Sequence, residues 1–292
     1  MQTLAPIALF VYRRTRRLNE VLDALEACPE FAHSDVYVFS DGPRDEPSAR
    51  DVAAVRELVR SRLRANMRLI ESPGSKGLDP SILEGVSRLL EEHGRVIVLE
   101  DDLLVAPNLL TWFNAALDRY EEAPEVMQIS GHMMNAPSLR SLQEGVFLPF
   151  ITSWGWATWK RAWDQFDPEA KGWDQLAADK ALRRRFDLGG AFPFARMLEQ
   201  HMQAEERLRA WDIRWYWTVF RCGGLALFPP ETLVLNVGTD SLASHNLLKR
   251  RLLNLVRPKR RLGVRTPALP ARLEVRPEVL GPVRRAFLFR GF

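Results

Sequence analysis

Apolar residues along the first hundred positions alternate between two spacings, one typical of strands and one typical of helices. Short apolar runs at 6–12, 35–42, 67–72 and 95–102 each end in polar residues, which predicts four buried strands. The segments between them place apolar residues every three or four positions, as amphipathic helices do. Strands that alternate with helices of about 10 to 15 residues predict an α/β fold with a mostly parallel central sheet flanked by helices.

The third helical segment carries its own boundary signals. Asp is a residue type that commonly caps a helix N-terminus, and Asp79 is followed by Pro80, which suits the first helical position. Gly94 stands where the helical spacing ends, as a terminating glycine does. We therefore expect a helix that is capped by Asp79 and ends near Gly94.

The charge of the chain is modest overall but uneven along its length. The formal net charge is +4 over 292 residues, whereas 247–265 and 283–290 are densely basic, with Leu, Val and Phe between the charges. This pattern suits an anionic membrane surface or a nucleic acid, and it also suits a solvated helix face. We expect a globular domain over 1–246 and a basic, membrane-associated tail over 247–292.

The remaining composition bears on the compartment. Cys28 and Cys222 are the only cysteines and form no CxxC pair, which favours a reducing environment. The apolar run near the N-terminus is short and precedes its charges, so we interpret it as a strand and not as a signal peptide. No run reaches the roughly 18 apolar residues that a membrane span requires. We expect a cytoplasmic protein, peripheral at the membrane through its tail.

Charged and polar residues collect where the predicted strands end. Tyr12 and Arg13 follow the first strand, Asp41 the second, Lys76 the third, and an acidic triplet at 100–102 the fourth. In parallel sheets, ligands bind beyond the carboxyl ends of the strands. These residues are therefore candidates for one binding site.

The acidic triplet consists of Glu100, Asp101 and Asp102, whose adjacent charges repel one another. The alternation of a strand would send Glu100 and Asp102 to one face and Asp101 to the other. Hard oxygen donors of this kind suit Mg²⁺ or Mn²⁺ holding a diphosphate, and nearby arginine and lysine could bind the same anion. The alternative is a solvated acidic loop without a ligand.

The segment "VIVLEDDLLVAPNLLTWF" at 96–113 resembles the acidic metal motif of GT-A fold glycosyltransferases, in particular the N-acetylglucosaminyltransferase I family and its bacterial relatives. The segments "VFSDGP", "KGLDPSILEGVSRLL", "FITSWGWATWKRAW" and "AWDIRWYW" are similar to other parts of that family. The resemblance extends over about 5–246. It implies a GT-A (Rossmann-like) domain with a nucleotide-sugar-binding half at 1–130 and an acceptor-binding half at 131–246.

The resemblance also implies roles for particular residues. Asp102 would hold the metal, Mn²⁺ or Mg²⁺, that bridges the donor diphosphate, with Glu100 and Asp101 near the ribose and sugar. Asp41 would face the base or ribose. Asp212 would be the general base that deprotonates the acceptor hydroxyl in an inverting transfer.

Asp212 has an alternative role as the N-cap of the helix that follows it. Asp164, Asp167 and Asp174 also flank aromatic residues and compete with it for the part of general base. His245 follows a predicted late strand within 232–246, in a polar loop, and is a candidate ligand of the metal or diphosphate. The alternative is that His245 is an ordinary surface histidine.

Tryptophans are concentrated in the second half of the chain. Several recur at helical spacing, as Trp211 and Trp215 do, which predicts that most belong to the core of a helical, Trp-rich, acceptor-side region. Trp154 and Trp156 flank Gly155, and a glycine there indicates a tight loop where backbone can approach a ligand. We expect Trp154, Gly155, Trp156 and Trp211 to contact the acceptor sugar.

The function that these observations favour is metal-dependent transfer of a sugar from a nucleotide donor, with UDP-sugar expected, to a glycan or lipid-linked acceptor. A role in bacterial surface polysaccharide or glycolipid synthesis fits a chain that starts on its first strand, whereas the animal enzymes carry a membrane anchor. A nucleotidyltransferase is an alternative, although the loop after the first strand lacks the glycine-rich triphosphate cradle. A basic, non-enzymatic nucleic-acid-binding protein is the other alternative, and only the tail supports it.

Overall fold

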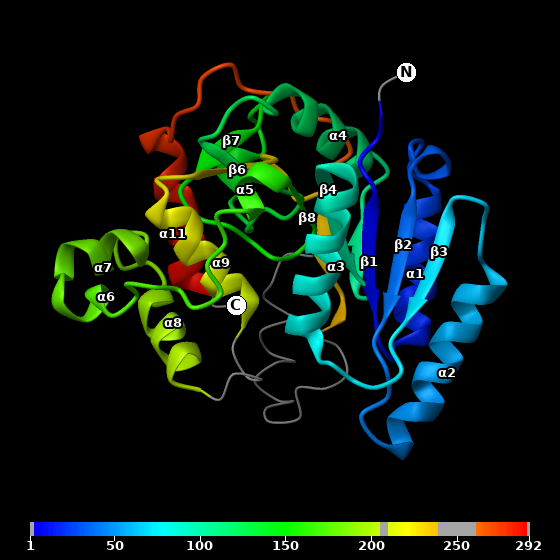
Figure 1. Ribbon diagram of the computed structural model, residues 1–292. Coiled ribbons are helices and arrows are strands. Elements are labelled where there is room, and N and C mark those ends of the chain that lie inside the picture. Colours follow the sequence, from blue (N-terminus) through cyan, green and yellow to red (C-terminus); the bar gives the residue numbers. More distant parts are fainter. Residues whose placement is uncertain (1–2, 205–209, 239–260, 291–292) are drawn as a thin grey trace.

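A computed structural model describes residues 3–204, 210–238 and 261–290. Within these residues, a central eight-stranded sheet has the order β3-β2-β1-β4-β8-β6-β9-β7 (Figure 1). The strands are β1 Ile7–Val11, β2 Val36–Ser40, β3 Met67–Glu71, β4 Arg95–Glu100, β6 Val126–Ser130, β7 Val146–Leu148, β8 Trp156–Trp159 and β9 Leu225–Phe228. The predicted α/β class with helices around a central sheet is confirmed.

The sheet is parallel through its first half and mixed through its second. Strands β3, β2, β1 and β4 pair in parallel, and β6 pairs in parallel with β9. Strand β8 runs antiparallel between β4 and β6, and β7 runs antiparallel to β9 at the edge. The four strands predicted from the sequence therefore form the parallel part of the sheet, with their carboxyl ends at one edge.

Helices cover both faces of the sheet because side chains of each strand alternate between them. Ile7 and Leu9 pack with one group of helices, and Ala8 and Phe10 pack with the other. The first group is α1 Thr15–Glu26, α2 Glu46–Ser61 and α4 Leu109–Arg119. The second group is α3 Leu78–His93, α5 Lys160–Trp163, α8 Phe194–Gln203, α9 Trp211–Arg221 and α11 Pro277–Arg290. Helix α3 of this group lies in front of the sheet in Figure 1.

Short elements complete the described chain. They are η1 Phe31–His33, η2 Pro137–Leu139, α6 Gln175–Ala178 and α7 Lys180–Phe186, together with β5 Leu103–Val105 and β10 Val234–Asn236. Strands β5 and β10 form a separate antiparallel pair. This pairing brings the chain just after β10 against the acidic triplet, because the amide of Val237 donates to the carbonyl of Asp102 over 2.8 Å.

Helix α3 begins two residues earlier than its capping signal predicts. Gly77, with φ of 86°, is the N-cap, and Leu78 is the first helical residue. The prediction that Asp79 is the cap is wrong, because its carboxylate instead pairs with the guanidinium of Arg214 at 3.4 Å. The predicted end is confirmed by Gly94, which adopts a left-handed conformation with φ of 75°.

The described part of the basic tail packs against the rest of the protein. The hydroxyl of Tyr120 donates to the carbonyl of Pro270 over 2.6 Å, and the amide of Gly145 donates to Ala268 over 2.9 Å. In α11, Val279, Val283 and Phe287 are buried. The domain boundary at 246 stays a prediction, since 239–260 lie outside the described residues. None of the helices in the described segments has the length and hydrophobicity needed to cross a bilayer.

Candidate active site

A cavity of about 380 Å³ lies at the carboxyl ends of β1, β2 and β4. We call it the acidic pocket. Its polar lining comprises Tyr12, Arg13, Arg14, Asp41, Arg44, Ser81, Glu100, Asp101 and Asp102. Phe10 and Phe39, whose stacked rings have centroids 5.0 Å apart, add an aromatic surface. The position matches the expectation that ligands of a parallel sheet bind beyond the carboxyl ends of its strands.

All three residues of the acidic triplet face this one pocket. The prediction that Asp101 points to the opposite face is wrong, because β4 ends at Glu100 and the chain turns at 101–102 before β5 begins. Strand alternation therefore does not extend through the triplet. The backbone amide of Tyr12 donates to Asp101 over 3.0 Å, and the Arg14 guanidinium pairs with both Asp101 and Asp102.

Four carboxyl groups and three guanidinium groups line the acidic pocket. Burial, followed by repulsion from Asp102, raises the pKa of Glu100 to about 8. Burial likewise raises the pKa of Asp101 to about 6, against the stabilising hydrogen bond from Tyr12 and the charge of Arg14. Within the described part of the chain, the Glu100 carboxylate has no hydrogen-bond or ion-pair partner. A proton or a further cation would relieve this charge.

The donor set of the acidic pocket fits a hard divalent cation that shares its ligands with a phosphate. The described residues contain no group of three or more His, Cys, Asp or Glu side chains arranged to hold a metal by themselves. A magnesium-type ion bound with a diphosphate, however, takes only one or two protein carboxylates. A Cβ atom at Gly238 would overlap the carboxylate of Asp102, with 2.7 Å to its Cγ, so a larger residue there would displace that carboxylate.

The other residues predicted for the nucleotide side differ in where their side chains point. Tyr12 and Arg13 line the acidic pocket. Asp41 also lines it, but its carboxylate accepts hydrogen bonds from Ser75 Oγ and from the amide of Lys76, both at 2.9 Å, and so fixes the loop before α3. The exposed side chain of Lys76 pairs with Glu84 and does not line the pocket.

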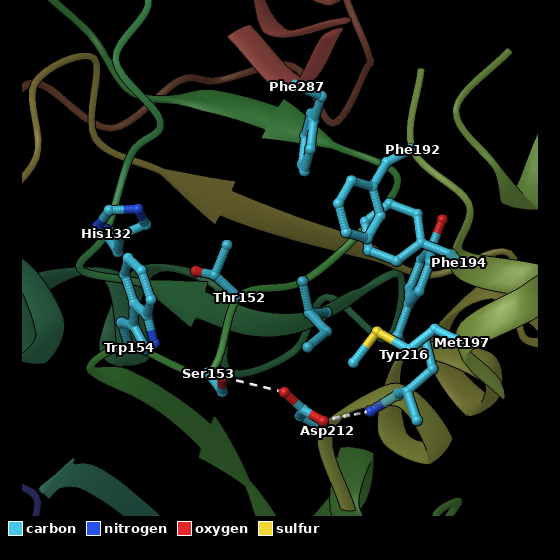
Figure 2. A pocket seen from close by; sticks show the side chains of 12 residues that line it. His132, Thr152, Ser153, Trp154, Phe192, Phe194, Met197, Asp212, Tyr216 and Phe287 are labelled. Atoms are coloured by element: carbon cyan, nitrogen blue, oxygen red, sulfur yellow. Dashed lines mark hydrogen bonds between the residues drawn. The ribbon is translucent and has the colours of Figure 1, made fainter. Parts of the chain in front are cut away.

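A second cavity of about 230 Å³ lies on the side of α8, α9 and α11 (Figure 2). We call it the aromatic pocket. Its lining residues are His132, Ile151, Thr152, Ser153, Trp154, Phe192, Phe194, Met197, Asp212, Ile213, Tyr216 and Phe287. They come from the segments after β6 and β7, from the start of α8 and α9, and from α11. Asp212 is the carboxylate among them.

Asp212 is the second residue of α9 and is held by two hydrogen bonds. Ser153 Oγ donates to its Oδ2 over 3.2 Å, and the amide of Ile213 donates to its Oδ1 over 2.8 Å. The N-cap alternative is wrong, because Ala210 occupies that position. Burial raises the pKa of Asp212. Its charge also contributes to the raised pKa of Glu100 in the acidic pocket.

The competing aspartates do not reach either pocket. Asp164 is exposed and pairs with Lys160 at 2.8 Å. Asp167 accepts hydrogen bonds from the amides of Glu169 and Lys171, and Asp174 is exposed before α6. Asp212 is thus the predicted base candidate that the structure places beside a cavity.

The predicted tryptophan platform is only partly present. Trp154 lines the aromatic pocket, with its ring 4.6 Å from that of His132. Gly155 has φ of 66°, as a tight loop requires, but a Cβ there would meet Val234. Trp156 and Trp211 stack on each other at 5.1 Å and are 1% and 3% exposed. They are core residues and line neither pocket, and their contact with the acceptor sugar stays a prediction.

Some of the residues that line the two pockets have no local sequence pattern that marks them as site residues. Arg44 of the acidic pocket lies in the loop before α2, and the apolar lining of the aromatic pocket comes from segments distant in sequence. Ser153 falls within the segment quoted for the family resemblance, but nothing in its spacing marks it as a partner of Asp212. His245 lies outside the described residues, so its predicted role stays a prediction.

No family model and no curated protein matches this chain. It is similar to the solved structure of the mannosyltransferase PcManGT from Pyrobaculum calidifontis in complex with GDP-Man and Mn²⁺, with a TM-score of 0.40, 14% identity and 76% of each chain covered. It is also similar to mouse xyloside xylosyltransferase 1, with a TM-score of 0.36, 14% identity, and coverage of 77% of this chain and 84% of that one. A third similar structure is S. aureus TarS, with a TM-score of 0.39, 14% identity and 77% of this chain covered, but only 35% of TarS. Since these TM-scores are low, the function proposed next rests on the two pockets.

Proposed function

We propose that this protein is a glycosyltransferase that moves a sugar from a nucleoside-diphosphate donor to an acceptor hydroxyl. The observation that carries the proposal is the position of Asp212. This carboxylate lines the aromatic pocket and is electrostatically coupled to Glu100 in the acidic pocket. A base that lines one cavity and interacts electrostatically with the carboxylates of another suits a reaction that joins two substrates.

The acidic pocket suits the donor. Arg13, Arg14 and Arg44 line it and can bind the diphosphate oxygens, while the rings of Phe10 and Phe39 offer an apolar surface to the nucleoside. Asp102, with Glu100 beside it, would hold a divalent cation together with the diphosphate. When bound, that cation stabilises the negative charge of the departing nucleoside diphosphate as a Lewis acid.

The aromatic pocket suits the acceptor. Asp212 would take the proton from the acceptor hydroxyl. At the same time the hydroxyl oxygen would bond to the anomeric carbon of the donor sugar, and the bond between that carbon and the diphosphate would break. Its raised pKa makes it a stronger base than an ordinary aspartate, and the hydrogen bond from Ser153 orients the carboxylate. Attack from the side opposite the diphosphate gives inversion at the anomeric carbon.

The finer assignments extend this proposal. We infer a UDP-sugar donor, with hexose or N-acetylhexosamine transferred, and a Mn²⁺ or Mg²⁺ cofactor. A glycan or lipid-linked acceptor in bacterial surface polysaccharide or glycolipid synthesis is part of the same proposal. So is cytoplasmic, peripheral membrane association through the basic residues at 247–265, whose described portion begins at 261. The nucleotidyltransferase and nucleic-acid-binding alternatives gain no specific support from the described residues.

A nucleotide-sugar panel tests the proposal. Each candidate is added to the full-length protein with and without Mn²⁺, and the melting temperature is measured. At a free ligand concentration of 100 times Kd, a donor that binds only the native state stabilises it by about 2.7 kcal/mol. We expect one donor class to stabilise the wild type only with metal and to lose most of this effect in Asp102→Asn. Equal stabilisation of the variant, or none by any donor, contradicts the proposal.

A further inference from the structure

The aromatic pocket has two chemically different ends. Ser153 and Asp212 form a polar end, joined by their hydrogen bond (Figure 2). On the far side of the cavity, the rings of Phe192, Phe194 and Phe287 contact one another, with centroids 4.6, 5.4 and 5.7 Å apart. Phe192 and Phe194 belong to the stretch that leads into α8, and Phe287 belongs to α11, so the apolar end is built from two segments distant in sequence.

Polar atoms near the apolar end already have partners within the protein. The hydroxyl of Tyr216 donates to the carbonyl of Phe186 over 2.8 Å. Thr152 Oγ1 lies 2.5 Å from Ser130 Oγ, in a buried hydrogen bond. A sugar ring carries hydroxyls around its edge, and each one placed among the phenyl rings without a partner would lower affinity by roughly tenfold. The far end therefore suits an apolar group better than a second sugar.

The size of the cavity sets the size of that group. An apolar protein cavity of about 150 Å³ is large enough for a benzene molecule. The aromatic pocket measures about 230 Å³, part of which must hold the atoms next to Asp212. An aryl ring or a short length of alkyl or prenyl chain would fill the remainder.

We propose that the acceptor is an amphiphile, with its reacting hydroxyl at Asp212 and an apolar aglycone or lipid segment among Phe192, Phe194 and Phe287. This inference rests on the proposed function for the identity of the reacting group. It narrows the proposed glycan or lipid-linked acceptor to one whose reacting hydroxyl lies within one sugar of an apolar substituent. Each buried methylene should then strengthen binding about fourfold.

Binding of a matched series of alkyl glycosides tests the inference without a donor. Methyl, butyl and hexyl β-glucoside, together with free glucose, are titrated into the full-length protein by ligand-observed NMR. We expect affinity to rise along the alkyl series by at least tenfold in total, and free glucose to bind most weakly. Equal affinity for glucose and hexyl glucoside overturns the inference.

Two variants place the effect in the pocket. Phe192→Ser makes the apolar end polar, and Met197→Phe fills it, so both should abolish most of the gain from the hexyl chain. Phe220→Ser is the matched control, since Phe220 is also partly buried and packs on Phe186, but does not line the pocket. Retention of the hexyl gain in Phe192→Ser and Met197→Phe overturns the inference. Failure of the proposed function would show separately, as a loss of metal-dependent donor stabilisation.

Discussion

The hydroxyl of Ser153 donates a hydrogen bond to the carboxylate of Asp212 over 3.2 Å and joins the segment after β7 to the first turn of α9. Ser153 favours the ionised carboxylate and lowers its pKa, whereas burial acts in the opposite direction and is the larger effect. The pair therefore fixes both the orientation of the proposed base and the pH at which it becomes active.

The first prediction concerns the pH profile of Ser153→Ala. Removal of the donated hydrogen bond destabilises the ionised carboxylate, so the pKa of Asp212 should rise further. Since the base acts in its ionised form, the acidic limb of the kcat profile should move to higher pH. Ser141→Ala, at an exposed serine outside both pockets, should leave the profile unchanged. An unshifted acidic limb in Ser153→Ala would contradict this role.

The second prediction concerns the cation and uses Gly238. An alanine there would displace Asp102, because the added Cβ has no space beside that carboxylate. We expect Gly238→Ala to weaken the apparent affinity for Mn²⁺ by about tenfold or more, the usual scale for displacing a supporting contact. The measurement is a Mn²⁺ titration of donor-induced stabilisation.

Gly74→Ala is the control for this titration. A Cβ atom at Gly74 would meet nothing within 4 Å, so its affinity for Mn²⁺ should match that of the wild type. Unchanged affinity in Gly238→Ala would show that Asp102 does not hold the cation.

The third prediction follows from the ion pair between Asp79 and Arg214, which are 3.4 Å apart and join α3 to α9. Burial is the main cause that raises the pKa of Asp79 to about 6 from its ordinary 3.8. The folded state therefore binds the Asp79 proton more tightly than the unfolded state does. The stability that this proton contributes is fully present below the ordinary pKa of 3.8 and is lost as pH rises through about 6. An asparagine at this position would carry no such titration.

We therefore expect the melting temperature of Asp79→Asn, relative to the wild type, to improve as pH rises from about 4 to about 7. Thermal unfolding across this range measures the difference. Asp174→Asn makes the same substitution at an exposed position and is the control. A relative melting temperature that falls over the same range would contradict the assigned shift.

The fourth prediction concerns α11, whose residues lie in the basic C-terminal segment. Val283 is 0% exposed within the aromatic core, so Val283→Asp should destabilise the fold by about 3 kcal/mol or more. Val264→Asp makes the same substitution at a site that is 86% exposed, and should change stability little. Urea unfolding compares the two. Equal stability would show that α11 does not belong to the folded core.

The parallel half of the sheet could be predicted from the sequence because its strands and helices have strong, local periodicity. Arg95–Glu100 reads as a buried apolar run, and Gly94 marks its start. The cap of α3 could not be predicted, because the helix begins at Leu78 and the carboxylate of Asp79 pairs with Arg214, which is distant in sequence. The direction of β8 and β7 depends on pairing partners distant in sequence, which no local pattern encodes.

The candidate site could likewise be predicted only in part from the sequence. Polar residues after β1, β2 and β4 could be assigned to one pocket from strand order alone. Trp156 and Trp211 were indistinguishable from Trp154 by local sequence, since burial of a tryptophan depends on what packs against it. The aromatic pocket combines Phe192 with Phe287, which are nearly a hundred positions apart and adjacent only in the folded chain.

The most direct measurement is the turnover of Asp212→Asn with the donor and acceptor identified by the two screens. If Asp212 deprotonates the acceptor hydroxyl, kcat should fall about 10²-fold or more, while the donor Kd and the melting temperature stay close to those of the wild type. Asparagine retains the size of the side chain. Its carbonyl oxygen can accept from the amide of Ile213, and its NH2 group can donate to the hydroxyl of Ser153. A variant that folds, binds donor and transfers sugar at the wild-type rate would contradict the proposed mechanism.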